Sequence, residues 1–442
     1  MSASASPSLG NASRSTTGGG VPSRPGAGAV ATARRSARQS TLREANLALV
    51  AATVFAAEEP ISRAGVSSLT SLTRSTVSRL VDDLVAGGVL DEIAPAAVTG
   101  PGRPATPLRP AAGRFGALGL QVNAGYLAAR LMDLSGRVLA ERVLDDDLIG
   151  SGPAPTLRRL GGIARGVLAE RPDRLTLVGT GLALPGIVDV AAGHLLSAPN
   201  LGWSDVDPTP DLLAGLGPDG DWAAGGRSGA PVGGLHVRVG NEADLAARAF
   251  AEPAPGRRGP LSDFVFLSGE VGIGGAIVLD GAAWSGRHGW AGEIGHVCVD
   301  PDGPRCRCGS TGCLEQYAGR RAMLAAAGLP ADTSPAELAV QARAGHPGAV
   351  AAIAEASRAL GIALAGVVNV LDIPTIVLSG HLGQVGDLLA PELTQVLGER
   401  VLSARWVAPE ITVAPEDLAP GATGAALLEL HGVIADPARY VD

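Results

Sequence analysis

Four residues with metal-ligand chemistry lie close together in one stretch of the sequence. His296 is followed by Cys306, Cys308 and Cys313 in "HVCVDPDGPRCRCGSTGC", which contains all four cysteines of this 442-residue chain. Three thiolates and one imidazole complete a tetrahedral zinc shell with no open position, which predicts a structural metal. Ordinary reduced cysteines are the less favoured alternative, because a Gly/Pro-rich loop has too few apolar residues to be stabilised by packing alone. Cys298, between two valines, is expected to be a small core residue.

Polar residues next to this loop could bind a hydroxylated ligand. Glu293 and His296 are three positions apart and would share a face if this turn is helical. If one ring nitrogen of His296 binds the metal, the other can hydrogen-bond a ligand. Taken alone, Glu293 could equally be a helix-capping or surface carboxylate.

A second polar pair follows an apolar run further upstream. Asn241 and Glu242 come directly after "HVRVG" and open a helical segment. An amide and a carboxylate at the carboxyl end of a strand suit sugar hydroxyls. An N-cap asparagine followed by acidic first-turn residues would give the same pattern, so this alternative stays open.

Composition limits the class of protein. The chain is 46% hydrophobic and 18% charged, which is typical of a globular protein with a large core. No apolar run approaches the roughly 20 residues of a membrane span, and the first 40 residues contain no hydrophobic signal region. We therefore expect a cytoplasmic protein without a membrane partner. Four cysteines are too few for a disulfide scaffold.

Charge is distributed unevenly along the chain. The first 114 residues carry twelve arginines and seven acidic residues, a net charge of +5, whereas the remainder carries −13. A basic front end on an acidic body favours nucleic-acid contact at the front. Biased codon usage combined with chance is the alternative explanation.

The front end has two parts. Residues 1–40 are low in complexity and rich in Ser, Gly, Ala and Arg, so we expect a disordered tail. From residue 41 a helical pattern runs until it stops before Pro60. Ser62 then can cap a short helix and Thr73 a second one, and "VLDEI" follows as a strand. This succession predicts a winged helix-turn-helix domain over residues 41–114.

The second short helix is the expected reading element for double-stranded DNA. Four apolar residues should face inward: Val77, Leu80, Val81 and Leu84. Short polar side chains and arginines lie on the other face and fit a major groove. The expected DNA contacts are Thr73, Arg74, Ser75, Thr76, Ser78 and Arg79, with Arg103 of the following Gly/Pro loop in the minor groove.

The rest of the chain alternates between strand and helix patterns. Short apolar runs such as "LTLVGTGLALPGIVDV" and "TIVLSG" alternate with helical runs such as "EADLAARAFAE". This alternation indicates an α/β architecture with a substantially parallel sheet.

Several motifs together resemble one family. The segments "GEIGH…CRCGSTGCLE", "LPGIVD", "APNLGW", "NEAD" and "SGEVGIGG" look like the ROK family of sugar kinases and transcriptional repressors, over roughly residues 117–430. The helix-turn-helix pattern in front of them resembles the repressor branch. The resemblance implies an actin-like (ribonuclease-H-like), two-lobed ATPase-type fold. Its lobes would be residues 115–235 and 236–442, the second with the zinc loop and a C-terminal helix that returns toward the first lobe.

The resemblance also implies site residues by motif position. The sugar contacts would be Gly186, Asn200, Asn241, Glu242, Glu293, His296 and Glu315. The ligands of a structural Zn²⁺ would be His296, Cys306, Cys308 and Cys313.

Three departures from the kinase pattern bear on catalysis. Where the kinases carry an Asp-x-Gly-Gly-Thr-type phosphate loop, this chain has Gln121-Val122-Asn123-Ala124-Gly125. Glu270 puts a carboxylate in the second phosphate loop, where like charges would repel a phosphate. The kinases' catalytic Asp is Glu242 here, and a shift of about 1 Å in a carboxylate can cost roughly 10²-fold in rate. Together these changes predict that sugar binding is kept, catalysis is lost and no residue is catalytic.

These patterns lead to one expected function. We expect a sugar-responsive transcriptional repressor of carbohydrate-metabolism genes that binds an operator as a homodimer or homotetramer and a sugar effector in its cleft. Two alternatives remain at this point: an ATP-dependent sugar kinase, and a body that binds a partner protein instead of sugar.

Overall fold

The computed structural model describes residues 27–94, 106–217 and 236–441, with side chains from Thr41 onward. The chain separates into two compact units, Met1–Ala45 and Asn46–Asp442. The second unit contains every feature discussed below, apart from the start of the first helix.

The first helix is longer than the sequence pattern predicts. Helix α1 spans Ala27–Phe55, so it begins inside the segment that we expected to be a disordered tail. The expectation was wrong for residues 27–40. Low complexity and low hydrophobicity do not prevent a helix here, because Ala, Arg and Gln have high helix propensities and no proline follows Pro25 until Pro60.

Two short helices follow α1 and are capped by hydroxyl side chains. Helix α2 (Arg63–Thr70) begins after Ser62, whose hydroxyl accepts from the Gly65 amide, and α3 (Arg74–Ala86) begins after Thr73, whose hydroxyl accepts from the Thr76 amide. Ser71 between the helices is left-handed, with φ of 60°. Helix α3 buries the four residues expected to face inward: Val77, Leu80, Val81 and Leu84.

A small antiparallel sheet completes this N-terminal region. Its strand order is β1 (Ile61–Ser62), β3 (Pro107–Pro110) and β2 (Leu90–Glu92). Residues 95–105 between β2 and β3 lie outside the described residues, and so does the expected minor-groove residue Arg103.

Two five-stranded sheets form the body, and they share one topology. The first has the order β6 (Val138–Asp145), β5 (Tyr126–Asp133), β4 (Phe115–Val122), β7 (Thr176–Leu184) and β11 (Val237–Asn241). The second has the order β14 (Ala282–Ala283), β13 (Ile273–Leu279), β12 (Phe264–Gly269), β15 (Thr375–Ser379) and β16 (Glu410–Val413). When the five strands of each sheet are numbered in the order in which they occur along the chain, both sheets have the strand order 3-2-1-4-5.

The sheets are mixed rather than largely parallel. In each sheet the first three strands pair antiparallel and the last two join in parallel. The expectation of a substantially parallel sheet therefore holds for the last two strands of each sheet and is wrong for the first three. The tight turns after β4, β5 and β12 leave no room for crossover helices, and short hairpin connections make antiparallel neighbours.

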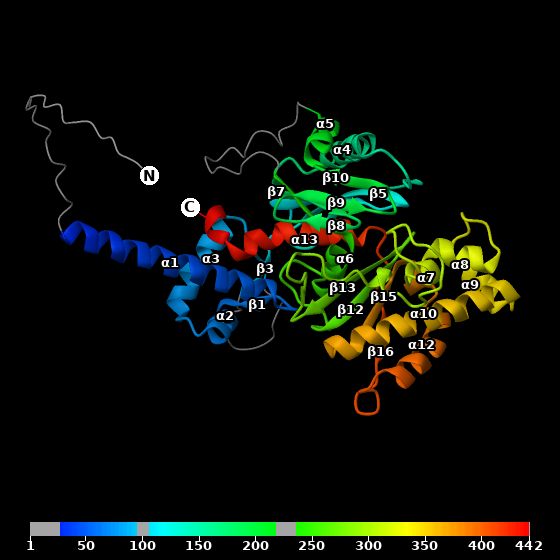
Figure 1. Ribbon diagram of the computed structural model, residues 1–442. Helices are drawn as coiled ribbons and strands as arrows, with labels where there is room; N and C mark the ends of the chain where they lie inside the picture. Colours follow the sequence, from blue (N-terminus) through cyan, green and yellow to red (C-terminus); the bar gives the residue numbers. More distant parts are fainter. Residues whose placement is uncertain (1–26, 95–105, 218–235, 442) are drawn as a thin grey trace, which may run out of the picture. The chain divides into compact units, whose positions relative to one another are not determined.

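The helices lie in layers against the two sheets (Figure 1). Helix α4 (Pro153–Ala169), with α5 (Thr209–Leu216) beside it, covers the outer face of the first sheet. Helices α13 (Pro420–Ala435) and α6 (Glu242–Ala251) lie between the two sheets, α13 against β4 and β7, and α6 against β13. Helices α10 (Pro347–Leu371) and α12 (Gly386–Arg400) cover the far face of the second sheet.

The remaining elements are short. They are β8 (Ile187–Asp189), β9 (His194–Ala198), β10 (Trp203–Val206), η1 (Ile294–His296), α7 (Glu315–Ala318), α8 (Arg320–Ala327), α9 (Pro335–Arg343), α11 (Gly380–Gln384) and η2 (Pro437–Tyr440).

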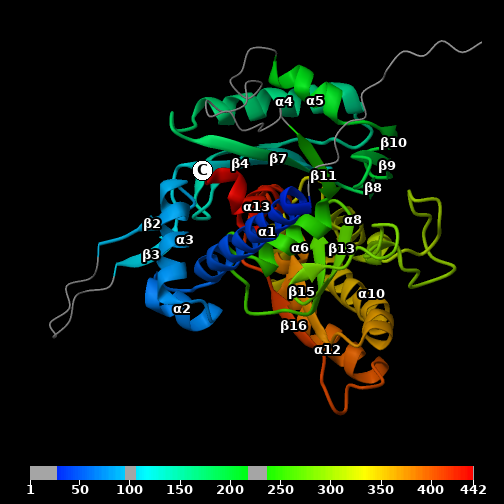
Figure 2. The same cartoon turned by 90° about the vertical axis from the view of Figure 1, so that its left-hand side faces the viewer.

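The C-terminal segment returns to the N-terminal helices. Figures 1 and 2 both place the end of the chain beside α3. One hydrophobic cluster contains residues of α1, α3, β4 and α13, among them Phe55, Leu80, Phe115 and Leu430. The N-terminal helices therefore share a core with the first lobe and with α13.

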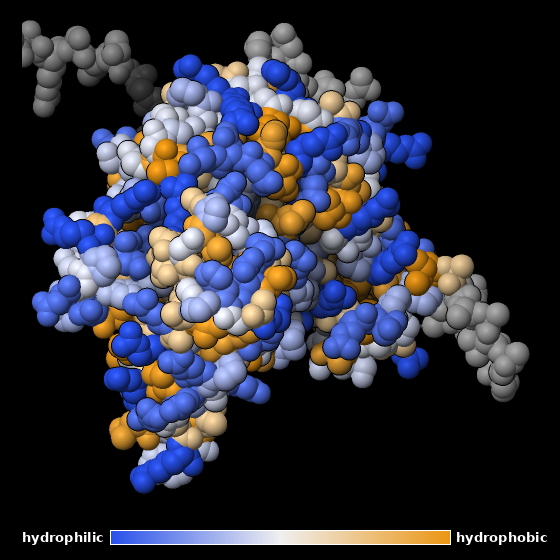
Figure 3. All heavy atoms as spheres, turned by 90° about the vertical axis from the view of Figure 1, so that its right-hand side faces the viewer, coloured by the Kyte–Doolittle hydropathy of each residue, from blue (hydrophilic) through white to orange (hydrophobic). Residues whose placement is uncertain are grey.

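One helix of the described part of the chain is long and apolar enough to cross a membrane. Helix α10 has a window of mean hydropathy 1.6, of which 56% is buried inside the protein. Core helices pass the same test of length and composition. The face of the molecule shown in Figure 3 carries hydrophobic residues interspersed with hydrophilic ones and no continuous hydrophobic band.

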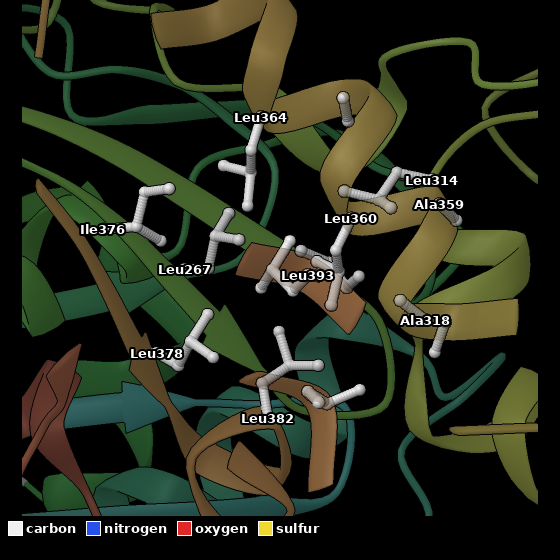
Figure 4. Packing of buried hydrophobic residues seen from close by; sticks show 14 of the residues in the cluster. Leu267, Leu314, Ala318, Ala359, Leu360, Leu364, Ile376, Leu378, Leu382 and Leu393 are labelled. Atoms are coloured by element: carbon white, nitrogen blue, oxygen red, sulfur yellow. The ribbon is translucent and has the colours of Figure 1, made fainter. Parts of the chain in front are cut away.

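Helix α10 packs into the core of the second lobe (Figure 4). Leu360 and Leu364 of α10 point toward Leu267 of β12, with Leu393 of α12 beside them. Leu314, which directly follows the cysteine stretch, is fully buried in the same cluster. The core thus anchors one end of the cysteine loop.

Candidate functional site

One pocket contains all seven residues that the motifs single out for ligand binding. Its lining comes from the end of β4, the segments around β8 to β10, the start of α6, the β12–β13 turn and the cysteine loop. The seven are Gly186, Asn200, Asn241, Glu242, Glu293, His296 and Glu315. Segments far apart in sequence, from Asn123 to Glu315, therefore meet at one cleft.

Glu242 lies at the bottom of this cleft as the first residue of α6. Its Oε1 accepts hydrogen bonds from Gln121 Nε2 and Asn123 Nδ2, both at 2.6 Å. Burial raises the pKa of Glu242 to about 7, although the two amide donors act in the opposite direction. One oxygen of the Glu242 carboxyl group, Oε1, is therefore held by two side chains of the segment that follows β4.

Gln121 links the cleft to helix α13. Besides Glu242, its Nε2 donates to the Tyr126 hydroxyl at 2.7 Å, and its Oε1 accepts from the Ala422 amide at 3.0 Å. Gln121 is 1% exposed, so these partners satisfy a fully buried amide.

Glu270 adds a second carboxyl group to the cleft. Burial raises its pKa to about 8, the charge of Glu242 adds to the rise, and Arg320 opposes it. Burial therefore favours the protonated form of both carboxyl groups, and a charge on Glu242 makes ionisation of Glu270 still less favourable.

Several backbone amides around the cleft already have partners within the chain. At the start of α6, the amides of Ala243 and Asp244 donate to Asn241 Oδ1 at 2.8 and 3.1 Å. In the β12–β13 turn, the Ile273 amide donates to Glu315 Oε2 at 3.1 Å. In the turn after β4, the Gly125 amide donates to Asn123 Oδ1 at 2.8 Å. These four backbone donors are thus used within the chain.

Hydrogen bonds also fix the side chains at the cleft wall. Asn241 Nδ2 donates to the Gly186 carbonyl at 2.8 Å, and Asn200 Nδ2 donates to Glu315 Oε2 at 3.2 Å. Gly186 has a φ of 92°, which only glycine adopts readily. An added Cβ there would lie 2.1 Å from the Ser197 carbonyl oxygen, so any side chain at this position would clash with the backbone.

The cysteine loop brings together a group that could hold a metal. The donor atoms of His296, Cys306, Cys308 and Cys313 all lie within 4.8 Å of one another. His296 Nδ1 is 3.8 Å from Cys306 Sγ, and Cys308 Sγ is 3.7 Å from Cys313 Sγ. Three sulfurs and one ring nitrogen at this spacing match the donor set of a tetrahedral site.

His296 faces the cleft with its other nitrogen. Its Nε2 is 3.9 Å from Glu293 Oε2, and both residues line the pocket. The metal group and the cleft therefore share one imidazole ring.

The expectation that Cys298 is a core residue was wrong. Its side chain is exposed, and it is not part of the metal group. The flanking valines do not form a buried strand, because Cys298 makes only an isolated bridge with Cys313 in an irregular loop.

The N-terminal helix α3 exposes polar side chains on the face opposite its buried one. Arg74, Ser75 and Arg79 are exposed, whereas Thr76 and Ser78 are partly buried. Thr73 has its hydroxyl engaged in the helix cap.

Sequence reasoning did not assign Asn123 to the site, nor did it predict the contact of Gln121 with α13. Asn123 lies in the segment that departs from the kinases' phosphate-loop pattern, and that departure alone does not indicate a contact with Glu242. The Gln121–Ala422 contact spans 301 residues, and no local pattern signals it.

Comparisons with known proteins agree on one family. Residues 233–431 match the model of the ROK family. The xylose repressor of Caldicellulosiruptor bescii is 27% identical over 381 residues, which are 83% of this chain and 90% of the relative.

Two solved structures are similar to this chain in fold. A ROK family transcriptional regulator, a homologue of the E. coli MLC protein, aligns with a TM-score of 0.67 and 26% identity over 89% of this chain and 97% of its own. The ROK hexokinase of Thermus thermophilus aligns with a TM-score of 0.53 and 28% identity over 71% of this chain and 97% of its own.

Proposed function

Because this chain belongs to the ROK family, we propose that it is a sugar-responsive transcriptional repressor that binds operator DNA at its N-terminal end and a sugar in its cleft. The single observation that carries this proposal is the extent of similarity. The regulator structure covers 89% of the chain, whereas the hexokinase covers 71%. The longer match favours a regulator with an N-terminal addition over a kinase of two lobes alone.

The N-terminal region suits a winged helix-turn-helix. Helices α2 and α3, the tight turn at Ser71 and the β1-β3-β2 sheet supply the required parts. In this proposal α3 enters the major groove with Arg74, Ser75, Thr76 and Ser78, while Arg79 contacts phosphate. A two-fold oligomer would read a pseudo-palindromic operator.

The cleft suits a sugar because its amides and carboxylates match hydroxyl groups. Each hydroxyl both donates and accepts a hydrogen bond, and Asn and Glu side chains provide the complementary partners. The proposed contacts are Gly186, Asn200, Asn241, Glu242, Glu293, His296 and Glu315, all of which line the pocket.

The metal group suits a structural Zn²⁺. His296, Cys306, Cys308 and Cys313 would hold the ion, which would supply a cross-link to a loop rich in Gly and Pro. His296 would then present Nε2 to the ligand from a fixed ring orientation.

Phosphoryl transfer is disfavoured by the contacts of the former phosphate loops. Glu242 is bound by Gln121 and Asn123, and Glu270 adds a carboxylate to the same cleft. A kinase needs backbone donors and a free general base at these positions. An ATP-dependent phosphorylation assay over common hexoses and pentoses should give no turnover, and a rate above a few per second would favour the kinase alternative.

Helix α13 is the element that we propose couples the cleft to the DNA-reading helix. In its first turn the Ala422 amide donates to Gln121 Oε1, and the segment after its C-terminal end reaches α3 (Figure 2). A Cβ added at Gly87, the C-cap of α3, would lie 2.5 Å from the Tyr440 carbonyl oxygen and 2.6 Å from a Val441 methyl. A sugar that moves Glu242 would therefore shift contacts that continue to α3.

The experiment that tests the proposed function combines two titrations on the full chain. A thermal-shift screen of sugars identifies a ligand, and fluorescence anisotropy measures binding to DNA from upstream of the chain's own gene. The proposal expects a stabilising sugar and salt-sensitive binding to that DNA. A chain that binds no sugar would favour the alternative that the body binds a partner protein.

A further inference from the structure

Cys298 lies directly opposite Cys313 across an antiparallel bridge. The amide after each cysteine donates to the carbonyl before the other cysteine, at 2.8 Å from Val299 and at 2.9 Å from Leu314. These two bonds flank the cysteines without joining them, which is the pattern of a non-hydrogen-bonded pair. The Cα atoms of such a pair lie about 4.5 Å apart, and the two side chains lie on the same face.

The backbone at this pair suits a disulfide bond. Disulfides join residues whose Cα atoms are roughly 4.4 to 6.8 Å apart, and a non-hydrogen-bonded pair falls within this range. The two segments are also in close contact, because the Asp300 carbonyl leaves no room for a Cβ at Gly312. A bond between the two sulfurs therefore needs side-chain rotation rather than a movement of the backbone.

The two thiols have different surroundings. Cys298 is exposed and lies outside the metal group, so a small oxidant in water can reach its sulfur. Cys313 is fully buried, and its Sγ lies 3.7 Å from Cys308 Sγ within the group. The fold therefore places an exposed thiol beside one of the four candidate metal donors.

We propose that Cys298 is an oxidation site, and that hydrogen peroxide joins Cys298 to Cys313 in a disulfide that removes Cys313 from the metal group. This inference goes beyond the repressor function. It uses the proposed Zn²⁺ site only for the consequence of the disulfide and not for its formation.

The reaction balances with one molecule of peroxide. Cys298 attacks one peroxide oxygen through its thiolate, the O–O bond breaks, and the thiol proton leaves with the other oxygen as water, so that a sulfenic acid remains. The Cys313 thiolate then attacks the Cys298 sulfur, the S–O bond breaks, and the released hydroxide takes up a proton to give a second water. The two sulfurs thus lose two electrons to the peroxide.

The disulfide leaves the metal group one donor short. His296, Cys306 and Cys308 remain, whereas a structural zinc site uses four protein ligands. A thiol reductant reverses the change, because thiol–disulfide exchange returns both cysteines to thiols. The oxidation therefore acts as a reversible release of the cysteine loop.

Peptide mapping of the zinc-loaded full chain after peroxide treatment tests the disulfide. Trypsin cleaves after arginine and separates the cysteines into three peptides: residues 288–305 with Cys298, 306–307 with Cys306, and 308–320 with Cys308 and Cys313. After alkylation of the remaining thiols, we expect the first peptide linked to the third, with fragment ions that assign the link to Cys313. A Cys298 that is alkylated, linked to another cysteine or joined to a second chain would overturn the proposal.

The Cys298→Ser variant tests the effect on the metal group. Without oxidant, wild type and variant should hold equal amounts of zinc, because Cys298 lies outside the group. With peroxide, the wild type should release zinc to a chromogenic chelator at least about fivefold faster than Cys298→Ser, and a thiol reductant with added zinc should restore it. Equal release rates would overturn the proposal. A wild type that holds no metal without oxidant would contradict the zinc site and this consequence, whereas the peptide map still decides the disulfide.

Discussion

Gln121 joins three parts of the molecule through one amide group. It reaches Glu242 on α6, Tyr126 on β5 and the backbone of α13. The kinases carry an aspartate at this position of the motif, and an aspartate could not donate to Glu242. In this chain the residue at this position therefore links α6, β5 and α13.

Cys308 and Cys298 offer a matched pair for testing the metal site. Cys308→Ser removes one donor of the four-ligand group and should lower the melting temperature by at least about 5 °C with loss of bound metal. Cys298→Ser changes an exposed thiol outside the group and should alter neither property. Differential scanning calorimetry and metal analysis provide the two readouts. Normal melting and metal content in Cys308→Ser would contradict the structural-zinc proposal.

The raised pKa of Glu270 predicts how stability depends on pH. Its pKa in the folded chain is about 8, above its ordinary value of 4.5, so the folded state binds the extra proton between these values. Its contribution is most favourable below about pH 4.5 and is lost as the pH rises through about 8. Glu242 shifts in the same direction, and Arg320 opposes the shift of Glu270.

Urea unfolding over this pH range tests the prediction. Glu270→Gln should gain stability relative to the wild type as the pH rises from about 5 to about 8. Parallel stability curves for the two proteins would show that Glu270 keeps an ordinary pKa.

Among the elements, α3 carries the expectation about DNA. Arg74 is exposed at the start of α3, away from the buried face of the helix. Arg74→Ala should weaken operator binding by about 1–3 kcal/mol at fixed salt without a change in melting temperature. Arg405→Ala removes an exposed arginine from the α12–β16 connection and serves as the control. Equal operator affinity in wild type and Arg74→Ala would exclude this placement of the reading helix.

The contact between α3 and the C-terminal segment can be perturbed separately. Gly87→Ala would force the Tyr440 backbone and Val441 away from α3, whereas Gly432→Ala on α13 meets nothing within 4 Å. Gly87→Ala should reduce the effect of sugar on operator affinity at least about threefold relative to the control. Anisotropy titrations with and without sugar measure this effect. An unchanged response to sugar in Gly87→Ala would contradict the proposal that α13 couples the cleft to α3.

Local signals explain which elements could be predicted. Ser62 and Thr73 cap α2 and α3 as their types indicate, and the apolar spacing of α3 matches its buried face. The early start of α1 does not follow from composition, because a low-complexity segment of high helix propensity can still form a helix. Cys298 was misplaced because two neighbouring valines do not determine burial in an irregular loop.

Long-range features of the site were beyond the sequence. The motifs predicted seven residues that line one pocket, but not that Asn123 and Gln121 would bind Glu242 across about 120 residues. Such contacts depend on how β4 and β11 lie in one sheet, and no local periodicity encodes that arrangement.

At the scale of the whole molecule, two sheets of one topology enclose the cleft. The order 3-2-1-4-5 occurs in both, and α13 and α6 lie between them. Two-lobed folds of this kind can change the angle between lobes when a ligand enters the cleft. In this chain α13 and the segment after it connect the cleft to α3, so a lobe movement has a route to the helix that we propose reads DNA.

The most direct test of the account is the affinity of the full chain for its operator with and without a saturating sugar. The account predicts a change of roughly 5- to 150-fold, which corresponds to a coupling of about 1–3 kcal/mol. An operator affinity that stays the same while calorimetry shows the cleft fully occupied by sugar would contradict it.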